Sequence, residues 1–226
     1  MVKLLIIILI MSFTSIFSQF RDVYDKLQTS ISFTKIYNDG KPSHIPTIKE
    51  GLPRNTRHTT EGYWIGSFPD KDNIKSLHSH NIKLIITVTY VNSSFNRIKS
   101  LINDLSITHL YIPIGSKFPK ISQSQLATIS SYDPNEIFVH CDHGADRSGI
   151  FIAYLLIKFH NYSVPRALLS VINRNDVHAL KKILFDHHYV ITDDDLLYTS
   201  IYSGNGGLKI RGESYIRLVT TFLYSL

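Results

Sequence analysis

The sequence has very little cysteine and a shortage of acidic residues. Cys141 is the only cysteine among 226 residues, so the chain can form no intramolecular disulfide and has no Cys-x-x-Cys metal or redox motif. The 18 acidic residues are outnumbered by 24 lysines and arginines, which gives a formal net charge of +6. An excess of basic residues favours anionic partners in general and does not identify any particular one. An ordinary solvated basic surface accounts for it more simply.

Internal repeats and low-complexity tracts are also absent from the sequence. Apolar residues make up 43% of the chain and charged residues 19%, a composition that supports a real core and argues against disorder. The length fits one mid-sized domain with short additions.

The amino terminus is typical of an export signal. Lys3 supplies a positive charge, residues 4–13 are almost wholly apolar, and small residues follow at Ser15 and Ser18. The apolar run is too short for a comfortable membrane span. We therefore predict a signal peptide over 1–18 and an exported protein, periplasmic or secreted, with no stable membrane partner after cleavage. An uncleaved membrane anchor at the amino terminus is the alternative.

Strands and helices are predicted to alternate through the middle of the chain. Residues 19–57 are punctuated by glycine and proline, so we expect an N-terminal extension that is mostly loop. One domain is expected over 58–226, with a helical carboxyl-terminal part. Strands are predicted over 63–65, 82–88, 108–112 and 136–140, and helices beginning near Asp70, Ser93, Ser122, Ser148 and Val164. This alternation predicts an α/β fold with a central, mostly parallel sheet flanked by helices.

The stretch from His140 to Gly149, HCDHGADRSG, carries the chemistry. A predicted strand ends in Cys141, a short loop follows, and a helix begins after Arg147. Such a loop turns successive backbone N–H groups inward as a nest for an anion, and the helix terminus adds its dipole. These groups favour a thiolate, while the planar fork of arginine can hold two phosphate oxygens. A nucleophile inside a phosphate cradle predicts phosphoryl transfer through a phosphocysteine. Gly144 and Gly149 are expected to give the backbone room to bend.

A nucleotide-binding loop or a metal site fits this stretch less well. The spacing of Gly144 and Gly149 matches a Walker A motif, but the required lysine and hydroxyl residue are replaced by Ile150 and Phe151. His140 and His143 have no cysteine partners for zinc, so no metal site is predicted. The acidic run 193–195 is more typical of a loop or a helix start, and the glycine-rich run 204–207 of a turn.

The motif resembles the HCxxGxxR[ST]G signature of the protein tyrosine and dual-specificity phosphatases, which are cysteine-dependent. Upstream, YWIGSFPD at 63–70 and the run at 82–88 resemble the opening strand-helix-strand unit of a bacterial-type, dual-specificity-like branch, and YIPI at 111–114 resembles the strand before its acid loop. The similarity spans roughly 57–174. It implies a phosphatase-type three-layer sandwich that needs no cofactor. The partner would be a phosphorylated protein or small molecule, not a nucleic acid.

The resemblance also implies roles for residues of the loop. Cys141 would be the nucleophile, Arg147 would bind phosphate and the transition state, and Ser148 would hydrogen-bond the thiolate. His140 would order the loop. The substrate phosphate would be bound by backbone N–H groups of Asp142, His143, Gly144, Ala145 and Asp146.

The sequence departs from the family in one respect. The family places an aspartic general acid in the loop after the strand at 108–112, but residues 115–120 here contain no carboxylate. Protonation of the leaving group is worth about 10²–10⁴-fold. Asp146 is the best substitute, since myotubularin-like phosphatases carry an aspartate just before the loop arginine with a proposed donor role. A structural role for Asp146 is an equal alternative, and Asp104 is a weaker candidate.

Lys117 and Lys120 lie in the same loop and could attract a second phosphate, although ordinary surface lysines are the preferred interpretation. We predict phosphomonoester hydrolysis, with a phosphotyrosine-type or a small organic or inositol phosphate as substrate. A catalytically weak, phosphate-recognising binding module is the alternative. A rhodanese-like sulfurtransferase is a third possibility, which the spacing of Cys141 and Arg147 fits less well.

Overall fold

The fold is built on a sheet of five strands: β1 (Arg57–His58), β2 (Trp64–Gly66), β3 (Leu84–Thr87), β4 (Thr108–Tyr111) and β5 (Ile137–His140). The computed structural model describes residues 51–90, 93–172, 176–192, 195, 207–210 and 213–226. The predicted signal and most of the predicted extension therefore lie outside the described residues, as do 193–194 and 204–206. All described residues belong to one unit, Ser43–Leu226.

The strand order is β1-β2-β5-β3-β4. β2, β5, β3 and β4 run parallel to their neighbours, and only the edge strand β1 is antiparallel. This confirms the predicted α/β class with a mostly parallel sheet. β5, the strand that leads into Cys141, is central because it lies between β2 and β3.

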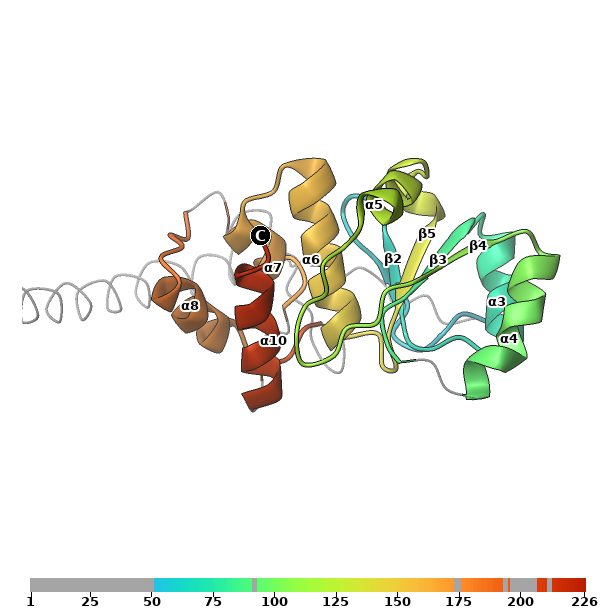
Figure 1. Cartoon of the computed structure of the whole chain (residues 1–226), viewed down its shortest axis with the longest axis horizontal. Helices are drawn as coiled ribbons and strands as arrows, with labels where there is room; N and C mark the ends of the chain where they lie inside the picture. The colour runs from blue at the N-terminus through green and yellow to red at the C-terminus, as the bar shows by residue number, and fades with distance from the viewer. Residues whose placement is uncertain (1–50, 91–92, 173–175, 193–194, 196–206, 211–212) are drawn as a thin grey trace, which may run out of the picture. The chain divides into compact units, whose positions relative to one another are not determined.

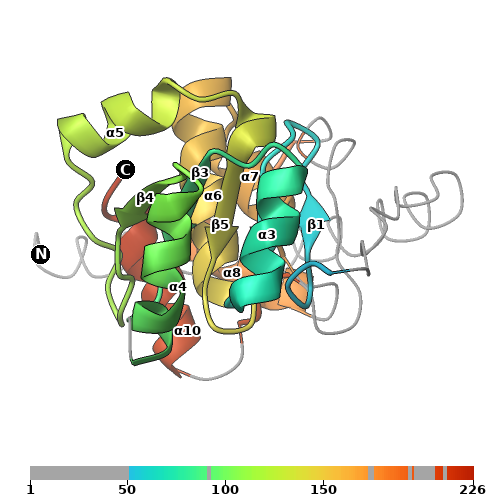
Figure 2. The same cartoon turned by 90° about the vertical axis from the view of Figure 1, so that its right-hand side faces the viewer.

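Alternating side chains of the strands face two separate apolar cores. Trp64, Ile85 and Phe138 belong to one core, and Ile65 and Val139 to the other. The first core is covered by α3 (Lys71–Ser79) and α4 (Ser93–Asp104). Helices of the other core are α5 (Gln123–Ser130), α6 (Asp146–His160), α7 (Val164–Leu169), α8 (Val177–Asp186) and α10 (Glu213–Leu223). Figures 1 and 2 show the resulting layers, with α3 and α4 on one side of the sheet and α6, α7 and α10 on the other.

Local capping explains where several helices begin. Asp70 and Ser122 each accept a hydrogen bond from a backbone N–H in the first turn and form capping boxes for α3 and α5. Ser163 caps α7, whose first turn contains Pro165. These starts agree with the predicted ones. α6 is different, because it begins at Asp146 rather than at the predicted Ser148.

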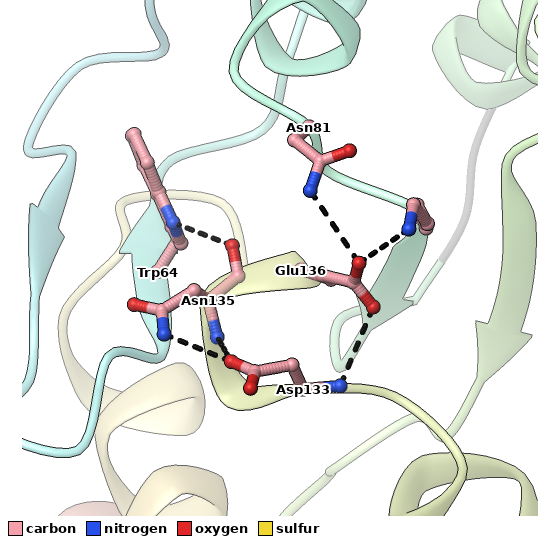
Figure 3. Close-up of polar contacts among 6 residues, drawn as sticks. Trp64, Asn81, Asp133, Asn135 and Glu136 are labelled. Atoms are coloured by element: carbon pink, nitrogen blue, oxygen red, sulfur yellow. Dashed lines mark hydrogen bonds and ion pairs between the residues drawn. The ribbon is translucent and has the colours of Figure 1, made fainter.

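A polar cluster fixes the amino end of β5 (Figure 3). The Asp133 carboxylate accepts hydrogen bonds from the backbone and side chain of Asn135. The Asn135 carbonyl accepts from the indole N–H of Trp64 on β2 at 3.0 Å. Glu136 pairs with Lys83, the residue just before β3. The cluster ties β5 to both of its neighbours at the end opposite Cys141.

Two parts of the fold were not predicted. β1 crosses the predicted boundary between residues 57 and 58, and the short segment 207–210 bonds to the turn after α7, where Leu208 N–H donates to the Val171 carbonyl at 2.6 Å. Among the described helices, none is both long and apolar enough to cross a membrane.

Candidate active site

The candidate site lies at the carboxyl ends of the central parallel strands. Cys141 follows β5 directly, Ser67 follows β2, and Thr89 comes two residues after β3. In open α/β sheets this edge is where ligands bind. The loop 141–145 returns from β5 into α6, so the loop and the helix start both lie at this edge.

Cys141 is the first residue of this loop and is buried, with 2% of its surface exposed. Its Sγ lies 3.4 Å from the Ser148 hydroxyl, which is itself fully buried in the first turn of α6. Ala145 occupies the N-cap position of α6 and makes no side-chain hydrogen bond there. The first N–H groups of α6 thus have no side-chain cap, as is expected where a helix terminus binds an anion.

The two glycines of the motif differ in what they do. Gly144 has a φ of 68°, and a Cβ at this position would lie 2.3 Å from the Gly66 backbone at the end of β2. Gly144 is therefore required both for its left-handed backbone and for its close approach. Gly149 lies within regular helix, and a Cβ there would meet only ordinary contacts, 3.6 Å or more away. The expectation that Gly149 is needed for backbone room was wrong.

The outward side of the loop is held by three hydrogen bonds to consecutive carbonyl groups. The carbonyl of Asp142 accepts from Phe68 N–H at 3.4 Å. His143 O accepts from the Asn55 side-chain amide at 2.8 Å, and Gly144 O accepts from the Arg57 guanidinium at 2.6 Å. The loop is thus held by Arg57 of β1, by Asn55 just before β1 and by Phe68 after β2.

The guanidinium of Arg147 is held by two groups at the same edge of the sheet. It donates to the Thr89 hydroxyl at 2.7 Å and pairs with the Asp142 carboxylate at 2.5 Å. Thr89 in turn donates to Asp142 at 3.0 Å. The side chain of Arg147 is 27% exposed and that of Asp142 46%, so this triangle lies at the open side of the loop.

His140 is fully buried and forms part of a hydrogen-bonded chain. Its Nε2 lies 2.8 Å from the Thr87 hydroxyl, which lies 2.8 Å from Nε2 of His109 on β4. Burial lowers the pKa of His140 to about 3. Burial likewise lowers the pKa of His109 to about 4, with a smaller contribution from Lys99. Both rings are neutral at physiological pH, which suits His140 to orienting the loop rather than transferring protons.

Asp146 lies in the first turn of α6 and contacts the carboxyl-terminal segment. One carboxylate oxygen accepts the backbone N–H of Lys209 at 2.8 Å. Burial raises the pKa of Asp146, and this effect is opposed by the hydrogen bond from Lys209 and by the charges of Lys209, Arg147 and His143. Asp146 is therefore both an anchor for the segment 207–210 and a carboxyl group with an increased tendency to hold a proton.

The remaining candidates for acid or substrate contacts are placed differently. Asp104 ends α4 and leads into the start of β4, so it lies at the amino edge of the sheet, opposite Cys141. Lys117 and Lys120 are exposed on the loop after β4. That loop is anchored by Phe118, whose N–H donates to the Thr221 hydroxyl of α10 at 3.2 Å.

Several residues of the site were not found from the sequence. Thr87 and Thr89 had a usable signal, because they are hydroxyl residues at the carboxyl end of a predicted buried strand. Arg57 and Asn55 had none, since they lie in a stretch without periodicity. Lys209 contributes through its backbone, which no residue pattern reveals.

The strand, loop and helix together place a buried cysteine beside a helix start that has no side-chain cap. No protein-family model and no curated protein sequence matches the chain. Among solved structures it is similar to PTPMT1, at 16% identity over 75% of this chain and 94% of that one, with a TM-score of 0.45. The core catalytic domain of the PP-IP phosphatase SIW14 from S. cerevisiae matches at 17% identity over 65% and 85%, with a TM-score of 0.40. TpbA from P. aeruginosa matches at 14% identity over 54% and 78%, with a TM-score of 0.38. These similarities of fold are distant, and the function inferred below depends on the loop itself.

Proposed function

We propose that the protein hydrolyses phosphomonoesters through a phosphocysteine intermediate. The observation that carries this proposal is the buried Cys141 Sγ, which lies 3.4 Å from the Ser148 hydroxyl in the first turn of α6, a helix whose start has no side-chain cap. A thiolate there is favoured by the helix dipole and by inward N–H groups. The same groups bind phosphate, so nucleophile and substrate are brought to one point.

The proposed reaction has two steps. In the first, the Cys141 thiolate attacks phosphorus, an S–P bond forms, the ester P–O bond breaks, and the leaving oxygen takes a proton. In the second, water attacks the phosphocysteine and gives a proton back to the group that donated one in the first step, a P–O bond forms, the S–P bond breaks to release the Cys141 thiolate, and inorganic phosphate leaves. Ser148 stabilises the thiolate that departs in this step, and Arg147 binds two phosphate oxygens once its fork turns from Asp142 to the substrate.

Asp146 is the proposed proton donor for the leaving oxygen. Burial raises its pKa, which favours the protonated form that a general acid requires. One of its oxygens accepts the Lys209 N–H, and the proposal assigns proton transfer to the other. The Asp146→Asn variant, compared on aryl and alkyl phosphates, distinguishes this role from a purely structural one.

The proposed substrate is a phosphotyrosine-type ester or a small organic or inositol phosphate. Aryl esters have good leaving groups and depend least on an acid, which suits a loop after β4 without a carboxylate. The same absence favours the second candidate function, a catalytically weak module that recognises phosphate on this fold.

The test is hydrolysis of para-nitrophenyl phosphate by the purified protein in reducing buffer with chelator. Turnover that Cys141→Ser abolishes would establish the thiol mechanism. Asp146→Asn should then lower kcat by about 10²-fold or more on an alkyl phosphate and much less on the aryl ester if Asp146 is the acid. Equal small effects on both would assign it a structural role. A folded wild type that binds vanadate without any turnover would favour the binding module, and sulfur transfer from thiosulfate to cyanide would point to a sulfurtransferase.

We also propose that the chain is exported by the signal over 1–18. The support is the order of Lys3, the apolar run and small residues in the sequence. Amino-terminal sequencing of the protein recovered from cells should begin at Gln19, whereas a chain that retains its start and sediments with membranes would indicate an anchor.

A further inference from the structure

We propose that Arg57 is a positioning residue of the phosphate loop, and that its buried charge, together with the Asn55 amide, makes the loop a stronger anion site and Cys141 a better thiolate. The inference rests on the proposed function, because it assigns a role in the same loop.

The peptide groups of the loop are held in one direction. The carbonyls of residues 142, 143 and 144 each accept from a donor on the outer side: Phe68 N–H, the Asn55 amide and the Arg57 guanidinium. In a planar trans peptide, the C=O and the following N–H point in opposite directions. Holding these three carbonyls from behind therefore turns the N–H groups of residues 143, 144 and 145 toward the inside of the loop.

Arg57 brings a buried positive charge to the back of the loop. Only 4% of its surface is exposed, and one guanidinium nitrogen lies 2.6 Å from Gly144 O and 3.1 Å from Asn55 O. Arginine stays protonated in proteins, and hydrogen bonds from a charged donor are shorter and stronger than neutral ones. A cation on this carbonyl polarises the peptide that joins Gly144 to Ala145, which makes its N–H a better donor to an anion.

The sheet and a tight turn fix Arg57 in this place. Arg57 pairs with Ile65 in the antiparallel β1–β2 register. Just before it, the turn at residues 53–56 is closed by Thr56 N–H to Pro53 O and is tied to the end of β2 by Ser67 N–H to Arg54 O. Asn55 has a φ of 60° in this turn, a conformation that asparagine tolerates better than most residues. The Asn55 and Arg57 side chains thus belong to a segment that hydrogen bonds hold against β2, beside the loop.

The experiment uses the single cysteine as its own probe. Because Cys141 is the only thiol, the pH dependence of iodoacetamide alkylation reports on it alone. Arg57→Met should move the alkylation midpoint upward by about one pH unit and weaken protection by inorganic phosphate by about tenfold. Arg57→Lys should lie between it and the wild type, because it keeps the charge without the fork. Arg54→Met removes an exposed arginine from the same turn and should behave like the wild type.

Thermal melting of each variant separates loss of the fold from loss of positioning. A folded Arg57→Met protein with the wild-type midpoint and wild-type phosphate protection would overturn the inference. If Arg57→Met does not fold, Arg57→Lys and Asn55→Gly provide the test. Asn55→Gly should weaken phosphate protection by about two- to fivefold. Wild-type behaviour of both variants would overturn the inference. Alkylation needs no turnover, so an inactive protein with Arg57-dependent protection would refute the phosphatase and keep this inference. Turnover of a phosphate ester, together with phosphate protection that does not change in the Arg57 variants, would support the phosphatase and refute this inference.

Discussion

At the scale of single residues, Asp142 and a substrate phosphate require the same partner. The Asp142 carboxylate lies 2.5 Å from the Arg147 guanidinium and accepts from Thr89. Phosphate needs that fork for bidentate binding. Because both side chains of the pair are partly exposed, the pair is screened by solvent and is worth only about 0.2–1 kcal/mol.

Asp142→Asn should therefore strengthen inhibition by vanadate or inorganic phosphate by about two- to fivefold. The measurement is the inhibition constant at low ionic strength. Asp104→Asn, which removes the same charge from the opposite edge of the sheet, is the control and should leave inhibition unchanged. Weaker inhibition in Asp142→Asn would mean that Asp142 orients Arg147 for the substrate rather than competing with it.

The buried histidines predict a pH dependence of stability. Burial lowers the pKa of His109 to about 4, below the value of about 6.5 in the unfolded chain. Between these values the unfolded state binds the additional proton, so stability falls as the pH is lowered from about 6.5 toward 4. His109→Gln should reduce this slope. The limit for one proton is about 1.4 kcal/mol per pH unit, and the reduction should be smaller than this limit because solvent reaches part of the ring.

Urea unfolding at pH 7, 6 and 5 would measure the slope. The exposed His178 provides the matched control, and His178→Gln should leave the slope as in the wild type. An unchanged slope in His109→Gln would show that this ring takes up no proton on unfolding.

Residue patterns predicted the position of the loop better than the contacts that support it. Cys141, Arg147 and Ser148 could be found from the sequence because strand, loop and helix start are local features with a defined spacing. The contact of Arg57 with Gly144 joins residues 87 positions apart. Nothing local distinguishes such an arginine from a surface one, because its burial depends on how β1 pairs with β2.

At the scale of secondary structure, the strands and the capped helices were predictable from short-range signals. β-branched runs marked β3 and β5, and helix starts were predicted near Asp70 and Ser122, where the structure has the capping boxes of α3 and α5. α6 began earlier than expected because Asp146 and Arg147 adopt helical geometry without a side-chain cap. The loop after β4 could be recognised only by what it lacks, a carboxylate, and its anchoring could not be predicted.

That anchoring depends on Phe118. Its ring lies 5.3 Å from Tyr154 of α6 and 5.1 Å from Phe222 of α10, between ring centroids, and 8% of its surface is exposed. Phe118→Ala should lower the free energy of unfolding by about 3 kcal/mol, since the cavity lies between two helices. Phe159→Ala, at an exposed position of α6, should cost less than about 1 kcal/mol. Equal values from denaturant unfolding would show that Phe118 does not hold the loop.

At the scale of the whole molecule, the carboxyl-terminal part completes the larger apolar core. The family resemblance in the sequence ends near residue 174, yet the core beyond α6 is closed by later segments. Apolar side chains from residues 207–226 are buried there, at Leu208, Ile210, Leu218, Val219, Phe222 and Leu223. A helical tail could be predicted from periodicity. Its place in the core could not, because several apolar faces compete for the same surface.

Removal of residues 207–226 should therefore prevent folding. Burying each of these six side chains is worth about 1.5–3 kcal/mol, which gives a sum on the order of 10 kcal/mol, as large as the roughly 5–15 kcal/mol that typically stabilises a domain. The deletion also removes the Lys209 N–H that Asp146 binds. We expect no cooperative thermal transition, increased binding of a hydrophobic dye and no protection of Cys141 by phosphate.

A shorter deletion is the control for this experiment. Residues 224–226 are exposed, so a chain that ends at Leu223 should melt like the full chain and keep phosphate protection. If the chain that ends at residue 206 also melts cooperatively and still protects Cys141, the sheet and α6 form an independent phosphate-binding unit. The carboxyl-terminal helix would then be an addition to this unit, and Asp146 would need a role other than anchoring the tail, which would strengthen its assignment as the proton donor.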